Sequence, residues 1–151
     1  WVHKTANVLD KLPKSLQGKG KQKIHDIYLA PTKEEGSSAF DAFVKEFDLK
    51  YPKAVETINK HRESLLTFYD FPAEHWMSIR STNVIESTFA TVRLRTKRTK
   101  GCGSRIATLT MVYKLAESAQ KRWRKLRGYK KLSAVWAGVQ FKDGVELEMA
   151  A

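Results

Sequence analysis

The stretch PTKEEGSSAFDAFVKEFDLKY, residues 31–51, decides the fold class of this 151-residue chain. Thr32 followed three residues later by Glu35 is a capping-box pattern, which is typical of the first turn of a helix. Four apolar residues then recur at i, i+3, i+4 and i+7, namely Phe40, Phe43, Val44 and Phe47. This spacing places them on one face of an α-helix. The stretch therefore predicts a helix with one buried side.

The neighbouring segments carry the same helical pattern. Apolar spacing predicts helices over residues 2–12, 15–30 and 52–69, and Pro52 suits the first helical position. A connector over residues 70–80 has room for one helical turn. Only the segment VQFKDGVEL, residues 139–147, alternates around an Asp-Gly pair, which indicates a short hairpin. We therefore expect a mainly α chain with at most a short hairpin near the C-terminus.

Two further helices are predicted in the middle of the chain. The first begins near Asn83 and ends at the glycines around Cys102, and its predicted buried residues are Ile85, Phe89 and Val92. The second is capped by Ser104 and stops at Gly128. Its predicted apolar stripe is Leu109, Val112, Leu115, Ala116, Ala119, Trp123 and Leu126.

The positive charge of the chain is concentrated in one segment. The net charge is +12, and the 45 residues from Ser87 to Lys131 hold 14 Lys and Arg against one Glu. The remainder of the chain has a net charge of −1. Such asymmetry favours an anionic polymer, above all nucleic acid, as the partner. An anionic membrane surface, an acidic protein or a solvated helix pair with no bound polyanion are the alternatives.

Composition limits the remaining classes of function. No apolar run has membrane length and no signal peptide is evident, so we expect no membrane association. The chain starts at Trp1 without an initiator Met, so we expect it to be a piece of a longer protein.

Its single cysteine, Cys102, excludes an internal disulfide and a complete cysteine zinc site. A chain without an internal disulfide fits a reducing cytoplasm. We interpret Cys102 as a simple loop cysteine.

One acid, Glu86, stands at the head of the basic segment RSTNVIESTFATVRLRTKRTKGCGS, residues 80–104. If Asn83 is the N-cap, Glu86 falls at the third helical position, where its carboxylate completes a capping box and is favoured by the helix dipole. Alternatively, the carboxylate holds a Mg²⁺ ion, which prefers oxygen ligands. That site would need at least two more carboxylates. The candidates, by residue type only, are Asp41, Asp48, Asp70 and Asp143.

Three segments resemble the mutator-type bacterial insertion-sequence transposases: STNVIESTFATVRLRTKRTKGCGSR (81–105), WVHKTANVLDKLP (1–13) and FYDFPAEHW (68–76). The resemblance spans essentially the whole chain. It implies a ribonuclease H-like catalytic domain with an Asp-Asp-Glu metal triad and an all-helical insertion before the Glu. Residues 1–79 would be that insertion, and residues 80–151 the C-terminal segment of the catalytic domain.

The same resemblance implies roles for two residues. Glu86 matches the third acid of the triad, which makes it a catalytic residue and a ligand of Mg²⁺ or Mn²⁺ in the full-length enzyme. His3 matches the His of a Cys-x-x-His pattern that follows the two aspartates. Both aspartates and that Cys are missing here, so we expect this piece to be inactive alone. Without the resemblance, His3 is more simply a solvated or helix-capping residue.

The implied function is that of a DNA transposase, which cuts and joins DNA phosphodiesters to move an insertion element. Double-stranded DNA would be its partner, a homo-oligomer its full-length form, and the cytoplasm its location, at the nucleoid when DNA is bound. The alternative is a stand-alone helical DNA-binding module without catalysis, and a third hypothesis is an interaction domain for an acidic protein.

The residues expected to contact DNA are mostly bases of the two middle helices. They are Arg80, Asn83, Arg93, Arg95, Lys97, Arg98, Lys100, Arg105, Lys121, Arg122, Arg124 and Lys125. Trp123 lies among them and could stack on a base. Its helical spacing from Ala119 and Leu126 favours a place in the core instead.

Overall fold

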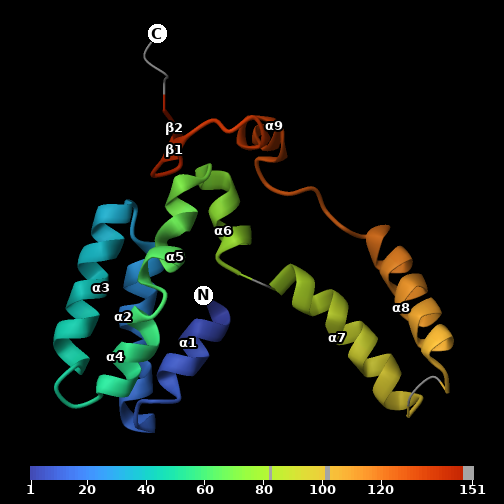
Figure 1. The fold of residues 1–151 in the computed structure, drawn as a ribbon, viewed down its shortest axis with the longest axis horizontal. Coiled ribbons are helices and arrows are strands. Elements are labelled where there is room, and N and C mark those ends of the chain that lie inside the picture. The colour runs from blue at the N-terminus through green and yellow to red at the C-terminus, as the bar shows by residue number, and fades with distance from the viewer. Residues whose placement is uncertain (82, 101–102, 148–151) are drawn as a thin grey trace. The chain divides into compact units, whose positions relative to one another are not determined.

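The computed structural model describes residues 1–81, 83–100 and 103–147, with the backbone alone for residues 83–85. The chain is mainly α-helical (Figure 1), so the predicted fold class is confirmed. Contacts within the chain divide it into two compact units. Unit 1 joins Trp1–Arg80 to Arg127–Ala151, and unit 2 is Ser81–Leu126.

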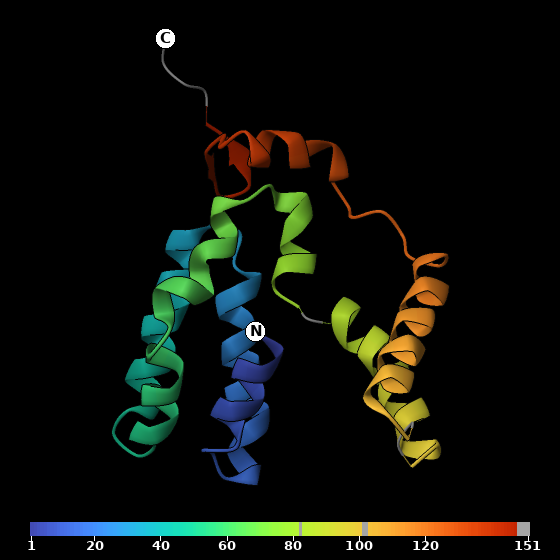
Figure 2. The same ribbon diagram turned by 45° about the vertical axis from the view of Figure 1, so that its right-hand side comes forward.

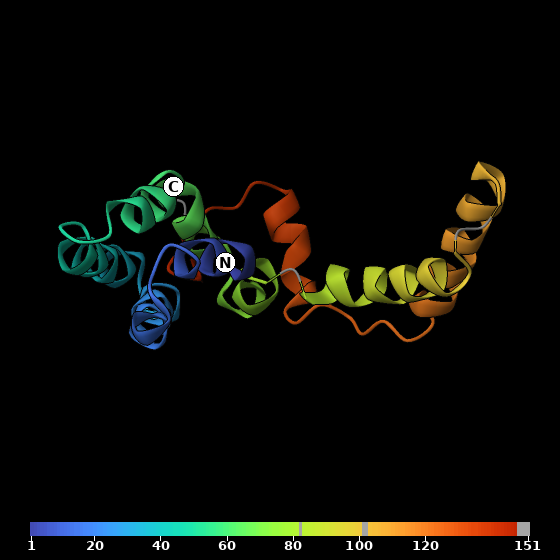
Figure 3. The ribbon, with the colours of Figure 1, turned by 90° about the horizontal axis from the view of Figure 1, so that it is seen from below.

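Unit 1 is built on four helices whose directions alternate along the chain (Figure 1). They are α1 (Val2–Leu9), α2 (Lys14–Leu29), α3 (Lys33–Phe47) and α4 (Pro52–Asn59). Figure 3 looks from below and shows α2 and α3 nearly end-on. Shorter elements follow: α5 (Arg62–Leu66), η1 (Thr67–Asp70), η2 (Ala73–His75) and α6 (Trp76–Ile79), where η marks a 3₁₀ helix.

Local sequence signals set the starts of these helices. The Thr32 side chain caps α3 by accepting a hydrogen bond from the Glu35 amide at 3.2 Å, as the capping-box pattern predicts. Pro52 stands at the beginning of α4, where its missing N–H costs nothing. Both predictions are confirmed.

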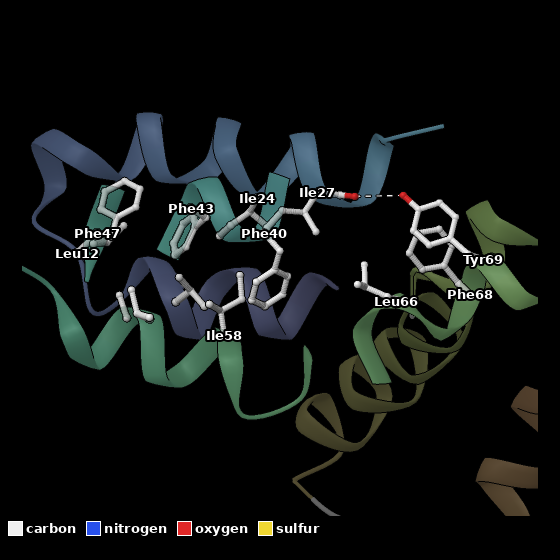
Figure 4. Packing of buried hydrophobic residues seen from close by; sticks show 13 residues of the cluster. Leu12, Ile24, Ile27, Phe40, Phe43, Phe47, Ile58, Leu66, Phe68 and Tyr69 are labelled. Carbon is white, nitrogen blue, oxygen red and sulfur yellow. Dashed lines mark hydrogen bonds between the residues drawn. The ribbon is translucent and has the colours of Figure 1, made fainter. Parts of the chain in front are cut away.

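The core of unit 1 lies between α1, α2, α3 and α4 (Figure 4). Phe40, Phe43 and Phe47 of α3 are buried, as their spacing predicts. In Figure 4, Phe40 and Phe43 lie near Ile24 of α2, and Phe47 lies beside Leu12. The rings of Phe43 and Phe47 are 4.7 Å apart between centroids. Burial of each such side chain stabilises the fold by about 1.5–3 kcal/mol.

The single helix predicted over residues 52–69 is broken into α4, α5 and η1. His61, at the break, has φ −134°, outside the helical range. Beyond it, Leu66, Phe68 and Tyr69 are all buried. Adjacent residues such as Phe68 and Tyr69 are about 100° apart on an α-helix, and the broken segment buries both.

The C-terminal part of unit 1 packs back onto these short elements (Figure 2). It contains η3 (Tyr129–Lys131), α9 (Leu132–Trp136), β1 (Phe141–Lys142) and β2 (Val145–Glu146). The two strands pair antiparallel, with Phe141 opposite Glu146, so the predicted hairpin is confirmed. At its turn, the Ala73 amide donates to the Gly144 oxygen and the Gly144 amide donates to the Tyr69 oxygen, each at 3.2 Å.

Unit 2 is a helical hairpin of α7 (Asn83–Arg98) and α8 (Arg105–Gln120), which run in opposite directions (Figure 1). Ser104 caps α8 as predicted, accepting from the Ala107 amide at 3.1 Å. The predicted break at Gly101 and Cys102 lies outside the described residues.

The prediction that α8 continues to Gly128 is wrong, because the helix ends at Gln120. Five of the next seven residues are basic. A continued helix would place like charges such as Lys121 and Lys125 four residues apart, which is unfavourable. Gly128 belongs to unit 1, where it precedes η3 with φ +65°.

The apolar residues of unit 2 are more exposed than their spacing predicts. Phe89 is 54% exposed and Leu109 is 58% exposed, so both were wrongly predicted to be buried. Val92 is half-buried, and the side chain of Ile85 lies outside the described part. A pair of helices can cover only the faces that they turn to each other, so a helical stripe alone overestimates burial here.

Candidate nucleic-acid interface

Glu86 lies in the first turn of α7, and its side chain is half-buried. The helix begins at Asn83 itself, so Asn83 is its first residue rather than its cap, and Glu86 is the fourth residue rather than the third. The side chain of Asn83 is outside the described part. A carboxylate in the first turn is still favoured by the positive end of the helix dipole.

The two residues predicted to be catalytic belong to different units. His3 is an exposed residue of α1 in unit 1, whereas Glu86 is in unit 2. The two residues therefore lie in separate compact units, and the catalytic role of His3 stays a prediction.

The acids in the described part of the chain do not form a metal site by themselves. Within residues 1–81, 83–100 and 103–147, no group of three or more His, Cys, Asp or Glu is placed to hold a metal ion. Three candidate aspartates instead have basic or amide partners in unit 1. Arg62 donates to Asp41 at 2.5 Å, Lys33 Nζ pairs with Asp70 at 2.8 Å, and the Lys33 amide donates to Asp143 at 2.6 Å. A divalent ion thus finds no complete ligand set here.

The basic residues of unit 2 lie on its surface. Unit 2 holds eleven Lys and Arg against two Glu, which gives +9 of the chain's net +12. All ten unit-2 bases predicted to contact DNA are exposed: Arg93, Arg95, Lys97, Arg98, Lys100, Arg105, Lys121, Arg122, Arg124 and Lys125. The last turn of α7 contributes Arg95, Lys97 and Arg98, where cations also complement the helix dipole.

Few acids oppose this charge. In the described part of unit 2, Lys114 and Glu117 form an ion pair at 3.0 Å on the exposed side of α8. Arg93, Arg95 and Lys97 form no ion pair with any described residue. Their charge is therefore available to a polyanion.

Trp123 is 57% exposed, so the expectation that it belongs to the core is wrong. It follows the end of α8 and lies between the exposed bases Arg122 and Arg124. An exposed indole among cations is typical of surfaces on which nucleic-acid bases stack.

Arg80, the remaining base among the predicted DNA contacts, has a different setting in unit 1. Its guanidinium donates to the Tyr28 main-chain oxygen and lies 5.3 Å from the centroid of the Phe68 ring. Burial lowers the pKa of Arg80 below its ordinary value. No local sequence signal distinguishes this arginine from the exposed bases, because Tyr28 and Phe68 are brought to it only by the fold.

Comparison with known proteins decides the family. A family model described as transposase, mutator family, matches residues 1–126. The chain belongs to the mutator family of transposases. The resemblance that the sequence motifs indicate is therefore confirmed.

Two relatives match this mutator-family chain over nearly its whole length. The transposase for insertion sequence element IST2 of Acidithiobacillus ferrooxidans is 50% identical over 145 residues, covering 96% of this chain and 49% of the relative. The transposase for IS6120 of Mycolicibacterium smegmatis is 50% identical over 148 residues, covering 98% of this chain and 46% of the relative. The chain thus spans about half the length of the curated relatives it matches.

A more distant match is the transposase for IS905 of Lactococcus lactis, 33% identical over 97 residues, which are 64% of this chain and 25% of the relative. No solved structure matches the chain. None of the described helices is both long and apolar enough to cross a membrane.

Proposed function

We propose that this chain is the part of a DNA-cutting and DNA-joining transposase that supplies the acid Glu86 and a basic DNA-contacting surface. The observation that carries the proposal is the membership of the mutator transposase family over residues 1–126. The position of Glu86 in the first turn of the helix whose other end carries Arg95, Lys97 and Arg98 supports it.

The charge of unit 2 is suited to the phosphate backbone of duplex DNA. Exposed Lys and Arg side chains that replace condensed counterions supply affinity without reading sequence. The ten exposed bases of unit 2 would take this role, and the half-exposed Trp123 would add a stacking surface.

Glu86 would act as one acid of a larger site. The family resemblance implies Mg²⁺ or Mn²⁺ in a ribonuclease H-like domain, and such an ion would activate an oxygen nucleophile against a phosphodiester. The described residues of this chain do not fit a complete metal site, so the other acids would come from the rest of the full-length protein. In this proposal residues 1–79 are a helical insertion, and the isolated chain is inactive.

A stand-alone DNA-binding module is the second candidate. The lack of a metal-binding group among the described residues favours it over a complete enzyme. The two candidates share the DNA-binding surface and differ in the chemistry assigned to Glu86.

Duplex binding by the 151-residue chain tests the DNA-contacting surface. With about six phosphate contacts, the affinity is expected to fall about a thousandfold between 50 and 200 mM salt. Replacing Arg93, Arg95, Lys97 and Arg98 by Gln should weaken binding and lower the salt slope by about four. Fluorescence anisotropy with a labelled duplex at several salt concentrations measures both.

A charge-matched variant is the control. It carries Gln at four exposed lysines of unit 1: Lys14, Lys21, Lys45 and Lys53. It loses the same four charges, so equal weakening by both variants would show that only net charge matters and would remove the assignment to unit 2. A flat salt response of the unmodified chain would remove the nucleic-acid surface altogether.

A further inference from the structure

The end of α8 in unit 2 carries an exposed aromatic side chain. Trp123 is 57% exposed and follows three residues after Gln120, the last residue of the helix. A turn sets its position, because the Trp123 amide donates a hydrogen bond to the Gln120 oxygen at 3.2 Å. The preceding Arg122 amide donates to the Ala119 oxygen at 2.9 Å. The backbone of Trp123 is therefore tied to the last turn of α8.

The fold of unit 2 brings Trp123 to the end of the helical hairpin that carries Glu86. Helices α7 and α8 pack against each other and run in opposite directions (Figure 1). In such a hairpin the last turn of one helix lies at the same end as the first turn of the other. Glu86 is in the first turn of α7, so it shares this end of unit 2 with Trp123.

The two ends of the hairpin present different surfaces. At the Glu86 end, four exposed bases lie on either side of Trp123 in the sequence: Lys121, Arg122, Arg124 and Lys125. The last turn of α7 places further bases, such as Lys97, at the opposite end. Glu86 and Lys97 are 11 residues apart, which is about 16 Å along a helix axis. This length corresponds to about five base pairs of DNA, at about 3.4 Å each.

An exposed indole suits an unpaired base better than a paired duplex. In a duplex the faces of the bases are covered by their stacked neighbours, so a side chain cannot stack on them unless a base leaves the stack. An unpaired base exposes its π-face, on which an aromatic ring stacks whatever the sequence. Exposed cations such as Arg122 and Arg124 can hold the phosphates on either side of that base. The Glu86 end thus combines the groups that bind single-stranded DNA.

We propose that Trp123 stacks on an unpaired DNA base next to the phosphodiester at Glu86, while the last turn of α7 holds paired DNA about five base pairs away. The proposal rests on the catalytic role proposed for Glu86. It names DNA with locally opened pairing as the substrate of that site. Stacking on Trp123 offsets part of the cost of taking the base out of the duplex.

Two DNA probes separate stacking from phosphate binding. One is a fully paired duplex. The other is the same duplex with mismatches at its central positions and 2-aminopurine as one of the mismatched bases. Trp123→Ala removes the ring, whereas Trp123→Phe keeps an aromatic face. Trp136→Ala is the matched control, because Trp136 is 94% exposed and lies at the end of α9 in unit 1.

The 151-residue chain should bind the mismatched probe about five- to a hundredfold more tightly than the paired one and quench its 2-aminopurine fluorescence. Trp123→Ala should lose both the preference and the quenching, with affinity for the paired probe kept within about twofold. Its salt slope should not change, because the bases that contact phosphates are intact. Trp123→Phe should keep most of the preference, and Trp136→Ala all of it. Fluorescence anisotropy and 2-aminopurine emission measure these effects.

DNA joining by the full-length protein tests where the stacked base lies. Trp123→Ala should slow joining of a paired element terminus about tenfold, because the base beside the cut is no longer held out of the duplex. Mismatches at the cut site should restore most of the rate, since that DNA is already open. Normal joining by Trp123→Ala, with the binding preference lost, would place the stacked base away from the cut and contradict the link to Glu86.

Three binding results would overturn the stacking site. Equal affinity of the unmodified chain for the two probes would mean that no unpaired base is bound. A preference that survives in Trp123→Ala, or that Trp136→Ala loses equally, would not belong to Trp123. Weaker binding of both probes by Trp123→Ala, with a lower salt slope, would make the ring a support for the neighbouring bases. These measurements need no catalysis, so they decide the stacking site even if Glu86 proves not to be catalytic.

Discussion

Tyr69 shows how a single polar group is accommodated in the core of unit 1. Its side chain is fully buried, and its hydroxyl lies 3.2 Å from the Ile27 oxygen and 2.9 Å from the Ala30 oxygen. Figure 4 shows the first of these contacts at the end of the apolar cluster. Burial raises the pKa of Tyr69 to about 12, because the phenolate would lose its hydration.

This raised pKa predicts a specific alkaline instability. The folded pKa exceeds the unfolded value of about 10, so the stabilisation is complete below pH 10 and is lost as the pH rises through about 12. Tyr69→Phe should lower the free energy of unfolding by about 1 kcal/mol at pH 8. It should also reduce the loss of stability between pH 8 and pH 11.

Urea unfolding at the two pH values measures both effects, with exposed Tyr113→Phe as the control. If the two variants lose stability equally between pH 8 and pH 11, the buried hydroxyl is not the titrating group that matters.

At the residue scale, sequence analysis succeeds where the signal is local. Thr32 and Ser104 cap helices because their partners are three residues away, and Phe43 is buried because its helical face is apolar. It fails for Arg80, whose partners are distant in sequence, and for Trp123, whose predicted helix ends before it.

At the scale of elements, the C-terminal hairpin depends on backbone that favours glycine. Asp143 and Gly144 have φ of +49° and +81°, which suits the two-residue turn that the Asp-Gly pair predicts. Gly144 also packs against Ala73, so that an added Cβ would lie 2.5 Å from the Ala73 Cβ. The turn is thus joined tightly to the start of η2.

Substitutions at two glycines separate the cost of the positive φ from the cost of the close contact with Ala73. Gly138 has φ +80° but open space around it, so Gly138→Ala should cost about 1–2 kcal/mol from the backbone alone. Gly144→Ala should cost about 1–3 kcal/mol more, because the neighbouring backbone must move. Chemical unfolding of the two variants gives the difference, and equal costs would mean that the Ala73 contact contributes nothing.

Element boundaries are predicted less well where tertiary structure decides them. The mainly α pattern, the capping box of α3 and the hairpin follow from periodicity and turn residues. The break at His61 is not marked by the apolar spacing, which continues across it, and Leu66, Phe68 and Tyr69 beyond it are all buried.

At the scale of the whole molecule, residues from Arg127 onward join the N-terminal helices in one compact unit. This grouping follows contacts, whereas the assignment of residues 1–79 to an insertion and 80–151 to a catalytic segment stays a prediction from the family. The homo-oligomer and the nucleoid location also stay predictions. The exposure of Phe89 and Leu109 shows that helical spacing alone does not give burial when few elements are present.

The central claim, that Glu86 is an acid of the transposase site, is tested most directly by DNA joining with the full-length Glu86→Gln protein. The amide keeps the size of the side chain and loses only the charge that the helix dipole favours in the first turn, so stability should change by about 1 kcal/mol or less. Glu117→Gln is the control, because Glu117 is the other acid of unit 2 and pairs with Lys114 on the surface of α8.

The measurement is joining of an end-labelled element terminus in Mg²⁺ or Mn²⁺, with the melting temperature and duplex affinity recorded beside it. We predict that Glu86→Gln slows joining by about a hundredfold or more while duplex affinity is kept, and that Glu117→Gln joins normally. Joining by Glu86→Gln at the rate of the unmodified protein would contradict the account and leave Glu86 with a role in helix α7 alone.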